Sequence, residues 1–178
     1  MSDHLLLSFY RMSMTADDVV GLWSLFQARQ LHVTIDGGWA VDAVLGRQTR
    51  EHCDLDIAIP HSQLPALRIA LAELGFEWIA SGGSWECNFV LADPGGRKID
   101  IHSFELDSEG NNRFGVPYAA PQLEWWGSIG GARVRCVPPE WQVKFHVGYQ
   151  FDDMDRQDVR ALCDHFEIPL PEQYRDLC

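Results

Sequence analysis

"IDGGWAVDAVLGRQTREHCDLDIAIP", residues 35–60, contains a pair of glycines and, after a short gap, two aspartates separated by one leucine. The run from His32 to Asp36 is short and rich in β-branched residues, which favours a strand. Gly37-Gly38 interrupts this run, and the residues from Trp39 to Leu45 predict a short helix that ends near Gly46. The stretch therefore predicts a strand, a glycine turn and a helix, followed by a second strand.

The second strand is predicted at residues 54–59, where polar and apolar residues alternate strictly. The alternation places Asp54, Asp56 and Ala58 on one face, and Leu55, Ile57 and Ile59 on the other. Two carboxylates on one face of a strand lie close enough to share divalent cations, and without cations they would repel each other. Two metal ions roughly 4 Å apart can bind a nucleoside triphosphate and activate an in-line attack on phosphorus.

A third carboxylate from a neighbouring strand would complete such a site, and Asp100 is the best candidate. The segment 87–106 predicts a hairpin that turns at Asp93-Pro94-Gly95-Gly96, and its second strand places Asp100, His102 and Phe104 on one face. A single aspartate here is more often a surface residue, and His52 and His102 are more often structural histidines than catalytic groups. The glycine pair would let phosphate oxygens approach the backbone at a helix N-terminus, although a glycine pair alone is as often only a tight turn.

The remaining segments predict a mixed α and β chain. Helices are expected at about residues 16–29, after a Thr15/Asp18 capping box, and at 64–74, where the helix stops at Gly75. Residues 111–131 predict a long loop or an irregular hairpin, before a strand at 133–137. Pro138-Pro139-Glu140 predicts the start of a helix with residues 141–149 as its body, and a last helix is expected at about 155–166. We therefore expect a core over residues 1–137 and a small helical C-terminal segment over 138–178, together forming one compact unit.

Composition narrows the partners of the chain. Its 178 residues include 14 basic and 26 acidic side chains, a formal net charge of −12, which argues against nucleic acid as the main partner. A cationic small molecule or metal ions would suit this charge better, although an acidic excess is also a common solubility feature. The five cysteines are scattered and form no CxxC pair, so neither a zinc site nor a disulfide framework is expected. No segment has the length and apolar character of a membrane span or a signal peptide, and we expect a cytoplasmic protein.

The motifs "DGGWAVDAVLGRQTREHCDLDIAI", "KIDIH" and "FHVGYQFDDMDRQDV" resemble those of the small antibiotic nucleotidyltransferases of the polymerase-β superfamily. These are the lincosamide nucleotidyltransferases and the related aminoglycoside 2''-adenylyltransferases. The resemblance runs from about residue 16 to 165. It implies an α+β chain with a polymerase-β-type nucleotidyltransferase fold, in which a mixed sheet is flanked by helices and a short helical C-terminal segment follows.

The resemblance also implies roles for individual residues. Gly37, Gly38 and Trp39 match the nucleotide-binding turn of the family. The metal-binding pair corresponds to Asp54 and Asp56, which would hold two Mg²⁺ ions together with a third acid. Asp100 matches that third acid, which in the family can also accept the proton of the attacking hydroxyl.

Basic residues near the matched motifs are candidates for neutralising the triphosphate of ATP or another NTP. They are Arg47, Arg50 and Lys144, although each taken singly is more often a solvated surface charge. The chain departs from the family pattern at Cys53, where relatives often have a charged or polar residue. Strand parity directs Cys53 away from the acids, so little chemical consequence is expected.

The implied reaction is attack by a substrate hydroxyl on the α-phosphorus of an NTP. "KIDIHSFELDSEGN" and "FHVGYQ" resemble the lincosamide branch more than the aminoglycoside branch, so the first expectation is inactivation of a lincosamide such as lincomycin or clindamycin. Tyr118, Trp125 and Trp126 are candidates for stacking on a sugar ring, although aromatic residues in such a segment more often serve packing alone. An aminoglycoside acceptor, a protein acceptor, and a nucleotide-binding module without catalysis remain alternatives; the presence of all three acids argues against the last. A homodimer is left open, with the apolar loop residues between Phe114 and Trp126 as its candidate interface.

Overall fold

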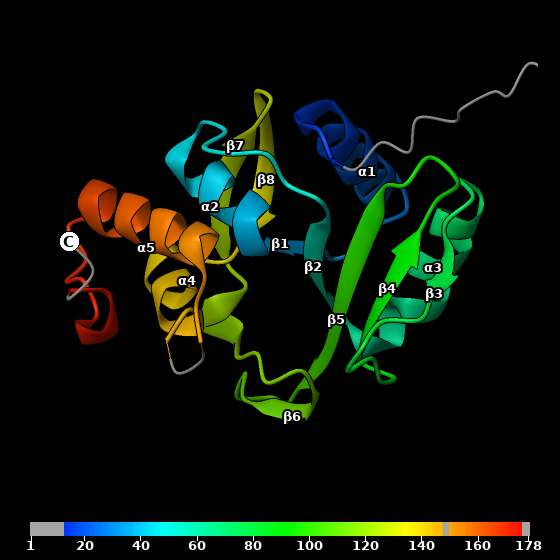
Figure 1. Cartoon of the computed structure of the whole chain (residues 1–178). Helices are drawn as coiled ribbons and strands as arrows, with labels where there is room; N and C mark the ends of the chain where they lie inside the picture. The colour runs from blue at the N-terminus through cyan, green and yellow to red at the C-terminus, as the bar shows by residue number, and fades with distance from the viewer. Residues whose placement is uncertain (1–12, 148–149, 176–178) are drawn as a thin grey trace, which may run out of the picture.

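The computed structural model describes residues 13–147 and 150–175 and shows a mixed sheet flanked by helices, as predicted (Figure 1). The α-helices are α1 (Ala16–Ala28), α2 (Gly37–Leu45), α3 (Leu64–Ala72), α4 (Pro139–Phe145) and α5 (Asp153–Phe166). The strands are β1 (Thr34–Asp36), β2 (Leu55–Pro60), β3 (Glu77–Ile79), β4 (Asn88–Ala92), β5 (Lys98–Leu106), β6 (Asn112–Gly115), β7 (Trp125–Ile129) and β8 (Ala132–Cys136). Short 3-10 helices lie at η1 (His61–Gln63), η2 (Ala120–Gln122) and η3 (Glu172–Tyr174).

The sheet has the strand order β3-β4-β5-β2-β1-β8-β7, and β6 pairs with the end of β5. Strand β2 runs parallel to β5, and β1 runs parallel to β8, while the other pairs are antiparallel. The pairing of β2 with β5 could not be seen in the sequence, because α3, β3 and β4 lie between the two strands along the chain. This parallel pair brings the two predicted acidic strands side by side.

One face of the sheet forms the main hydrophobic core. Leu55, Ile57 and Ile59 of β2 are at most 1% exposed and pack in one cluster with apolar residues of α1 and α3. Each helix contributes an apolar face, as its periodicity predicted. Phe26 of α1 and Leu67 of α3 are examples, with 1% and 0% of their surface exposed. Since these helices cover this face, the face with the aspartates points the other way (Figure 1).

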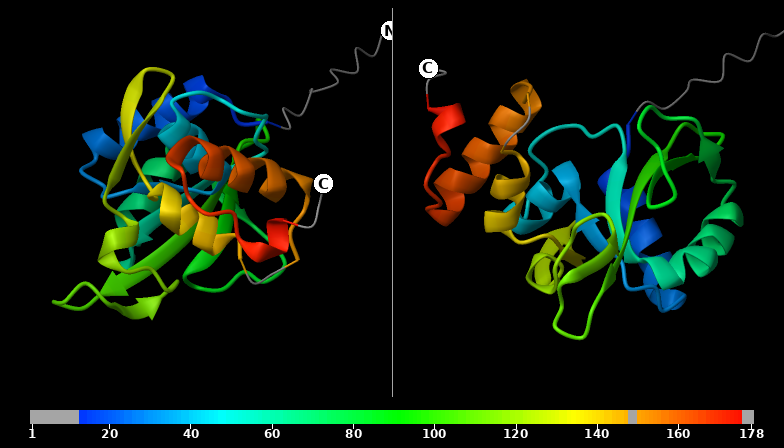
Figure 2. Two further views of the ribbon diagram at one scale, coloured as in Figure 1. Left: turned by 90° about the vertical axis from the view of Figure 1, so that its left-hand side faces the viewer. Right: turned by 90° about the horizontal axis from the view of Figure 1, so that it is seen from below.

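Helix α2 joins the sheet to the C-terminal helices. Its residue Trp39 belongs to the main core, whereas Val41 packs with Val143 of α4 and Val159 of α5 in a second cluster. Figure 2 shows α4 and α5 on one side of the molecule, with α3 at the opposite end of the sheet. The boundary between a core and a helical segment after residue 137 stays a prediction. The predicted extension of α4 to Tyr149 ends earlier, at Phe145, and Tyr149 itself lies outside the described residues.

Residues 111–131 are more ordered than a loop. Strand β6 pairs with β5, and β7 forms an antiparallel hairpin with β8, so the alternative of an irregular hairpin was the better one. Gly127 lies in the middle of β7, where an added Cβ would be 2.3 Å from the backbone oxygen of Ala43. The glycine therefore lets α2 pack closely on β7. Because glycine is uncommon inside strands, it also kept the sequence pattern from indicating a strand here. Among the described residues, no helix is both long and apolar enough to cross a membrane.

Candidate active site

Three aspartates form a row across neighbouring strands. Asp36 of β1 lies opposite Asp56 of β2, and Asp56 lies opposite Asp100 of β5. Residues in register on adjacent strands project from the same face, and adjacent strands are about 4.8 Å apart. Asp54 lies immediately before β2 and is half-buried. The two predicted acidic strands are thus neighbours, and Asp36 adds a carboxylate that was not predicted.

The environment of Asp56 and Asp100 opposes their full ionisation. Burial raises the pKa of Asp56 well above its usual value, and the negative charges of Asp54, Asp36 and Asp100 raise it further. The pKa of Asp100 is also raised, by burial and by Asp54, although His102 partly opposes the rise. Because the charge of Asp54 acts on both acids, Asp54 lies within electrostatic reach of the pair. Buried carboxylates that repel one another are stabilised when a cation lies between them.

The donor atoms in this row suit a divalent metal ion. Among the residues that the structure describes, one group of potential ligands has its atoms within 4.8 Å of one another, and it consists of Asp56, Asp100 and His102. The Oδ1 atom of Asp100 is buried and has no hydrogen-bond partner, a costly arrangement unless a ligand satisfies the atom. It is 3.6 Å from Nε2 of His102, which is too long for a hydrogen bond. The residues present therefore fit a hard cation such as Mg²⁺.

A buried tyrosine links Asp36 of the row to His102. The hydroxyl of Tyr118 donates a hydrogen bond to Asp36 and lies 3.0 Å from Nδ1 of His102. Burial and the adjacent Asp36 raise the pKa of Tyr118 well above its usual value, which keeps the hydroxyl protonated as a donor. Tyr118 is 3% exposed, so its side chain packs and does not offer a face for sugar stacking. His102 therefore has more than the structural role expected for it, because its ring also lies next to Asp100.

Sequence reasoning missed Asp36 and the link through Tyr118. Asp36 ends β1 and caps α2, and its carboxylate accepts a hydrogen bond of 2.8 Å from the backbone of Gly37. The sequence does contain a signal for its place at the start of α2, because Asp36 directly precedes the glycine pair and aspartate is a preferred N-cap residue. No sequence pattern relates Tyr118 to Asp36, because the two residues are 82 positions apart.

The glycine pair makes the close packing of the row possible. Gly37 has a φ of +59°, and a Cβ at this position would lie 2.1 Å from Oδ2 of Asp56. A Cβ at Gly38 would lie 2.5 Å from Nδ1 of His52 and from Nη2 of Arg50. The first N–H groups of α2 have no carbonyl partner within the helix. Asp36 accepts a hydrogen bond from the first of them, that of Gly37. The turn thus presents the positive end of a helix beside the acids.

The other predicted binding residues are placed differently. The ring of Trp39 is 1% exposed and packs 4.5 Å from the ring of His52, so only its backbone remains for a ligand. Arg50 lies beside Gly38, but its guanidinium binds the buried carboxylate of Asp158 at 2.8 Å. Lys144 is exposed on α4, with its amino group 4.1 Å from the centre of the Trp141 ring.

His52 has the structural role expected for it. It is 3% exposed, and its Nε2 atom is 2.5 Å from Oδ2 of Asp42, which is also buried. Trp125 and Trp126, which were considered for sugar stacking, are 41% and 42% exposed on β7. Trp126 lies under the guanidinium groups of Arg133 and Arg135, at 4.5 Å and 5.3 Å.

Comparisons with known proteins agree on one kind of enzyme. A family model described as aminoglycoside-2''-adenylyltransferase matches residues 18–162. A lincosamide resistance protein of Staphylococcus haemolyticus is 26% identical over 160 residues, which cover 84% of this chain and 95% of that protein. A 2''-aminoglycoside nucleotidyltransferase of Escherichia coli is 45% identical over 111 residues, which cover 61% of this chain and 59% of that protein. The chain thus spans less than two thirds of the length of the aminoglycoside relative.

Solved structures confirm the nucleotidyltransferase fold. A lincosamide antibiotic adenylyltransferase with bound lincomycin superposes with a TM-score of 0.74 at 22% identity, over 88% of this chain and 99% of that one. The aminoglycoside enzyme ANT(2'')-Ia, in complex with adenylyl-2''-tobramycin, gives a TM-score of 0.70 at 21% identity, over 85% of this chain and 88% of that one. The predicted resemblance and fold are therefore both confirmed.

Proposed function

Because the chain belongs to the aminoglycoside-2''-adenylyltransferase family and is a nucleotidyltransferase, we propose that it transfers a nucleoside monophosphate from ATP to a hydroxyl of a lincosamide. The observation that carries the proposal is the row of carboxylates across β1, β2 and β5. Its buried Asp100 oxygen without a hydrogen-bond partner supports a role for cations in the site. The product would be a nucleotidyl ester that no longer has the free hydroxyl of the antibiotic.

Asp54, Asp56 and Asp100 would hold the divalent ions, as the resemblance implies, with two Mg²⁺ ions as the expected complement. When bound, such ions supply positive charge that stabilises the triphosphate and the charge that develops on the leaving group. Gly37 and Gly38 would let the phosphates approach the first turn of α2. Lys144 remains a candidate for contact with the phosphates, whereas Arg50 is engaged by Asp158 and would act mainly by supporting the turn.

Asp100 is our candidate for the general base. The acceptor oxygen would form a bond to the α-phosphorus, the bond from that phosphorus to pyrophosphate would break, and the hydroxyl proton would pass to Asp100. A carboxylate beside metal ions stays ionised, so Asp100 would act as the base by directing a lone pair at the hydroxyl of the acceptor. Positioning and charge stabilisation would supply most of the rate acceleration.

Two relatives suggest different acceptors. The lincosamide relative matches along 95% of its own length, and the aminoglycoside relative has the higher identity over a shorter stretch. The overall charge of −12 favours a cationic acceptor of either class. We put the lincosamide first because the match to that relative extends along most of both chains. The aminoglycoside remains the second candidate because of the 45% identity.

A mass-spectrometric transfer assay tests this function. The protein is incubated with Mg²⁺ and each of four NTPs, against lincomycin, clindamycin and a set of aminoglycosides. We expect a lincosamide product heavier by one AMP, and a decrease of at least 10³-fold with Asp56→Asn, because this change removes a carboxylate from the centre of the row. Asp164→Asn, on the exposed surface of α5, is the matched control and should keep wild-type activity.

Other products would redirect the assignment. An aminoglycoside product without any lincosamide product would move the acceptor to the second candidate. Labelled protein without a modified antibiotic would instead indicate a protein acceptor. Wild-type turnover by Asp56→Asn would exclude the proposed role of the row.

A further inference from the structure

The row of acids continues as an apolar strip on the same face of the sheet. Asp100 of β5 lies opposite Val90 of β4, and Val90 lies opposite Ile79 of β3. A second row runs beside it, from Lys98 through Ala92 to Glu77. With strands about 4.8 Å apart, Ile79 lies roughly 10 Å from Asp100 along the sheet. The face that holds the acids therefore extends without a break to the edge strand β3.

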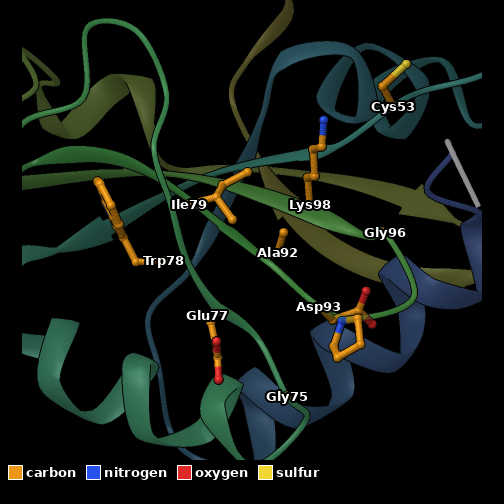
Figure 3. Close-up of a pocket in the computed structure, with 10 residues that line it drawn as sticks. Cys53, Gly75, Glu77, Trp78, Ile79, Ala92, Asp93, Gly96 and Lys98 are labelled. Carbon is orange, nitrogen blue, oxygen red and sulfur yellow. The ribbon is translucent and has the colours of Figure 1, made fainter. Parts of the chain in front are cut away.

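A groove occupies this extension. It has a volume of about 660 Å³ and is lined by residues that include Cys53, Glu77, Trp78, Ile79, Ala92 and Lys98. We call it the β3–β4 groove; Figure 3 shows Ile79, Ala92 and Lys98 next to one another within it. Trp78 is 57% exposed, and Ile79 and Ala92 are only partly buried. This volume lies within the range of small-molecule sites, which are typically apolar with a few polar groups.

The charges around the groove are balanced. Glu77 and Lys98 lie at the two ends of one row, with Ala92 between them. Asp93, at the other end of the groove, binds the guanidinium of Arg97 at 2.7 Å. A ligand with several positive charges would be matched by an excess of carboxylates, and this groove does not offer one. Its apolar floor, which includes Ile79 and Ala92, suits an apolar group instead.

We propose that the β3–β4 groove binds an apolar portion of the acceptor, while the hydroxyl to be modified lies at Asp100. This inference rests on the proposed nucleotidyl transfer and adds the requirement that the acceptor have an apolar group roughly 10 Å from that hydroxyl. Because the register of the sheet joins Asp100 through Val90 to Ile79 of the groove, one extended ligand is the occupant that fits both parts. Lincomycin has this form, since it joins a sugar to an alkylated proline. The sugar portion alone lacks the apolar group.

Protection of a thiol tests binding without relying on transfer. Cys53 lies before β2, so the strand parity that was expected to turn it away from the acids does not apply to it. It is exposed and lines the groove, whereas Cys87, Cys136 and Cys163 are buried. We expect lincomycin to slow alkylation of Cys53, measured by peptide mass spectrometry at a fixed concentration of Mg²⁺ and ATP. The sugar portion alone should protect much less. Equal alkylation rates with and without lincomycin would overturn the proposal.

Variants in the groove provide the kinetic test. Ile79→Ser removes apolar contacts, and Ala92→Phe fills the groove; both should raise the KM for lincomycin, by about fivefold and tenfold or more, respectively. The KM for ATP, the kcat, and the KM for the sugar portion should stay within twofold of wild type. Ile69→Ser is the matched control, because Ile69 is 61% exposed on α3. An unchanged KM for lincomycin in both groove variants would contradict the proposal.

The two tests separate the groove from the reaction. Protection of Cys53 without any transfer would leave the groove assignment in place and reject lincosamide modification. Transfer without protection, and with wild-type KM in the groove variants, would support the reaction and reject the groove. If Ile79→Ser alters only the oligomeric state in size-exclusion chromatography, the groove is an interface between copies of the chain, and the proposal is wrong.

Discussion

Asp56 is the residue at which burial and like charge act together. It lies between Asp36 and Asp100 on the neighbouring strands, and its pKa is raised well above the usual value. When folding raises the pKa of a carboxyl group, its contribution to the free energy of unfolding is fully present below the pKa of the unfolded chain. This contribution is lost as the pH rises through the higher pKa of the folded state. In the absence of metal, ionisation of Asp56 therefore destabilises the fold at neutral pH.

We expect Asp56→Asn to be more stable than wild type at pH 8 in the presence of a chelator, because asparagine does not ionise. The advantage should shrink as the pH falls toward about 4, where the wild-type carboxyl becomes protonated in both states. Urea unfolding of both proteins at several pH values measures the difference in free energy. Asp164→Asn, on the exposed surface of α5, should show no such pH-dependent difference. A difference between Asp56→Asn and wild type that is constant from pH 4 to pH 8 would exclude this role for the ionisation of Asp56.

At the scale of elements, the loop after α2 is tied to the last helix by one ion pair. The guanidinium of Arg50 donates to both carboxylate oxygens of Asp158, at 2.8–3.2 Å, and Asp158 on α5 is 1% exposed. The same guanidinium lies against Gly38, at the start of α2. The pair therefore connects the glycine turn, the acidic strand β2 and the C-terminal helices.

Arg50→Ala should lower the free energy of unfolding by about 2–3 kcal/mol, because it leaves the Asp158 carboxylate buried without its partner. We place the loss just below the range of roughly 3–5 kcal/mol for fully buried pairs because the Arg50 side chain is 21% exposed. Urea denaturation measures it. Arg47→Ala, in the same loop but exposed, is the control and should change stability by less than about 0.5 kcal/mol. Equal stability of the two variants would exclude a structural role for the pair.

Elements with strong local signals could be predicted from the sequence. The capping box at Thr15, the end of α2 at Gly46 and the alternation in β2 are all present as expected. Strand β3 has only three residues and no alternation to reveal it. The glycines and aromatic residues of β6 and β7 are typical of a loop or an irregular hairpin, so the sequence does not indicate two regular strands there. Their pairing depends on partners elsewhere in the chain.

The sequence predicts the individual residues of the candidate site but not the contacts between them. The aspartates of β2 and β5 could be assigned to faces by parity, whereas the parallel register that sets Asp56 opposite Asp100 is a tertiary contact. The hydrogen bond from Tyr118 to Asp36 likewise joins segments far apart in the sequence. Trp39 illustrates a limit of the resemblance, because a matched position can serve the core instead of contacting the ligand.

For the whole molecule, the net charge of −12 and the row of acids together predict how metal ions affect stability. Mg²⁺ at about ten times its dissociation constant should stabilise the folded state by roughly 1.4 kcal/mol, which raises the Tm by about 3–5 °C for a chain of this size. Calorimetry with and without the ion measures the shift. General screening of the acidic surface would also raise the Tm, so NaCl at equal ionic strength separates that effect from binding. Asp56→Asn/Asp100→Asn protein should respond to Mg²⁺ no more than to NaCl, because the double substitution removes two of the carboxylates that would hold the ion. If this variant gains as much from Mg²⁺ as wild type does, the ions bind elsewhere on the acidic surface.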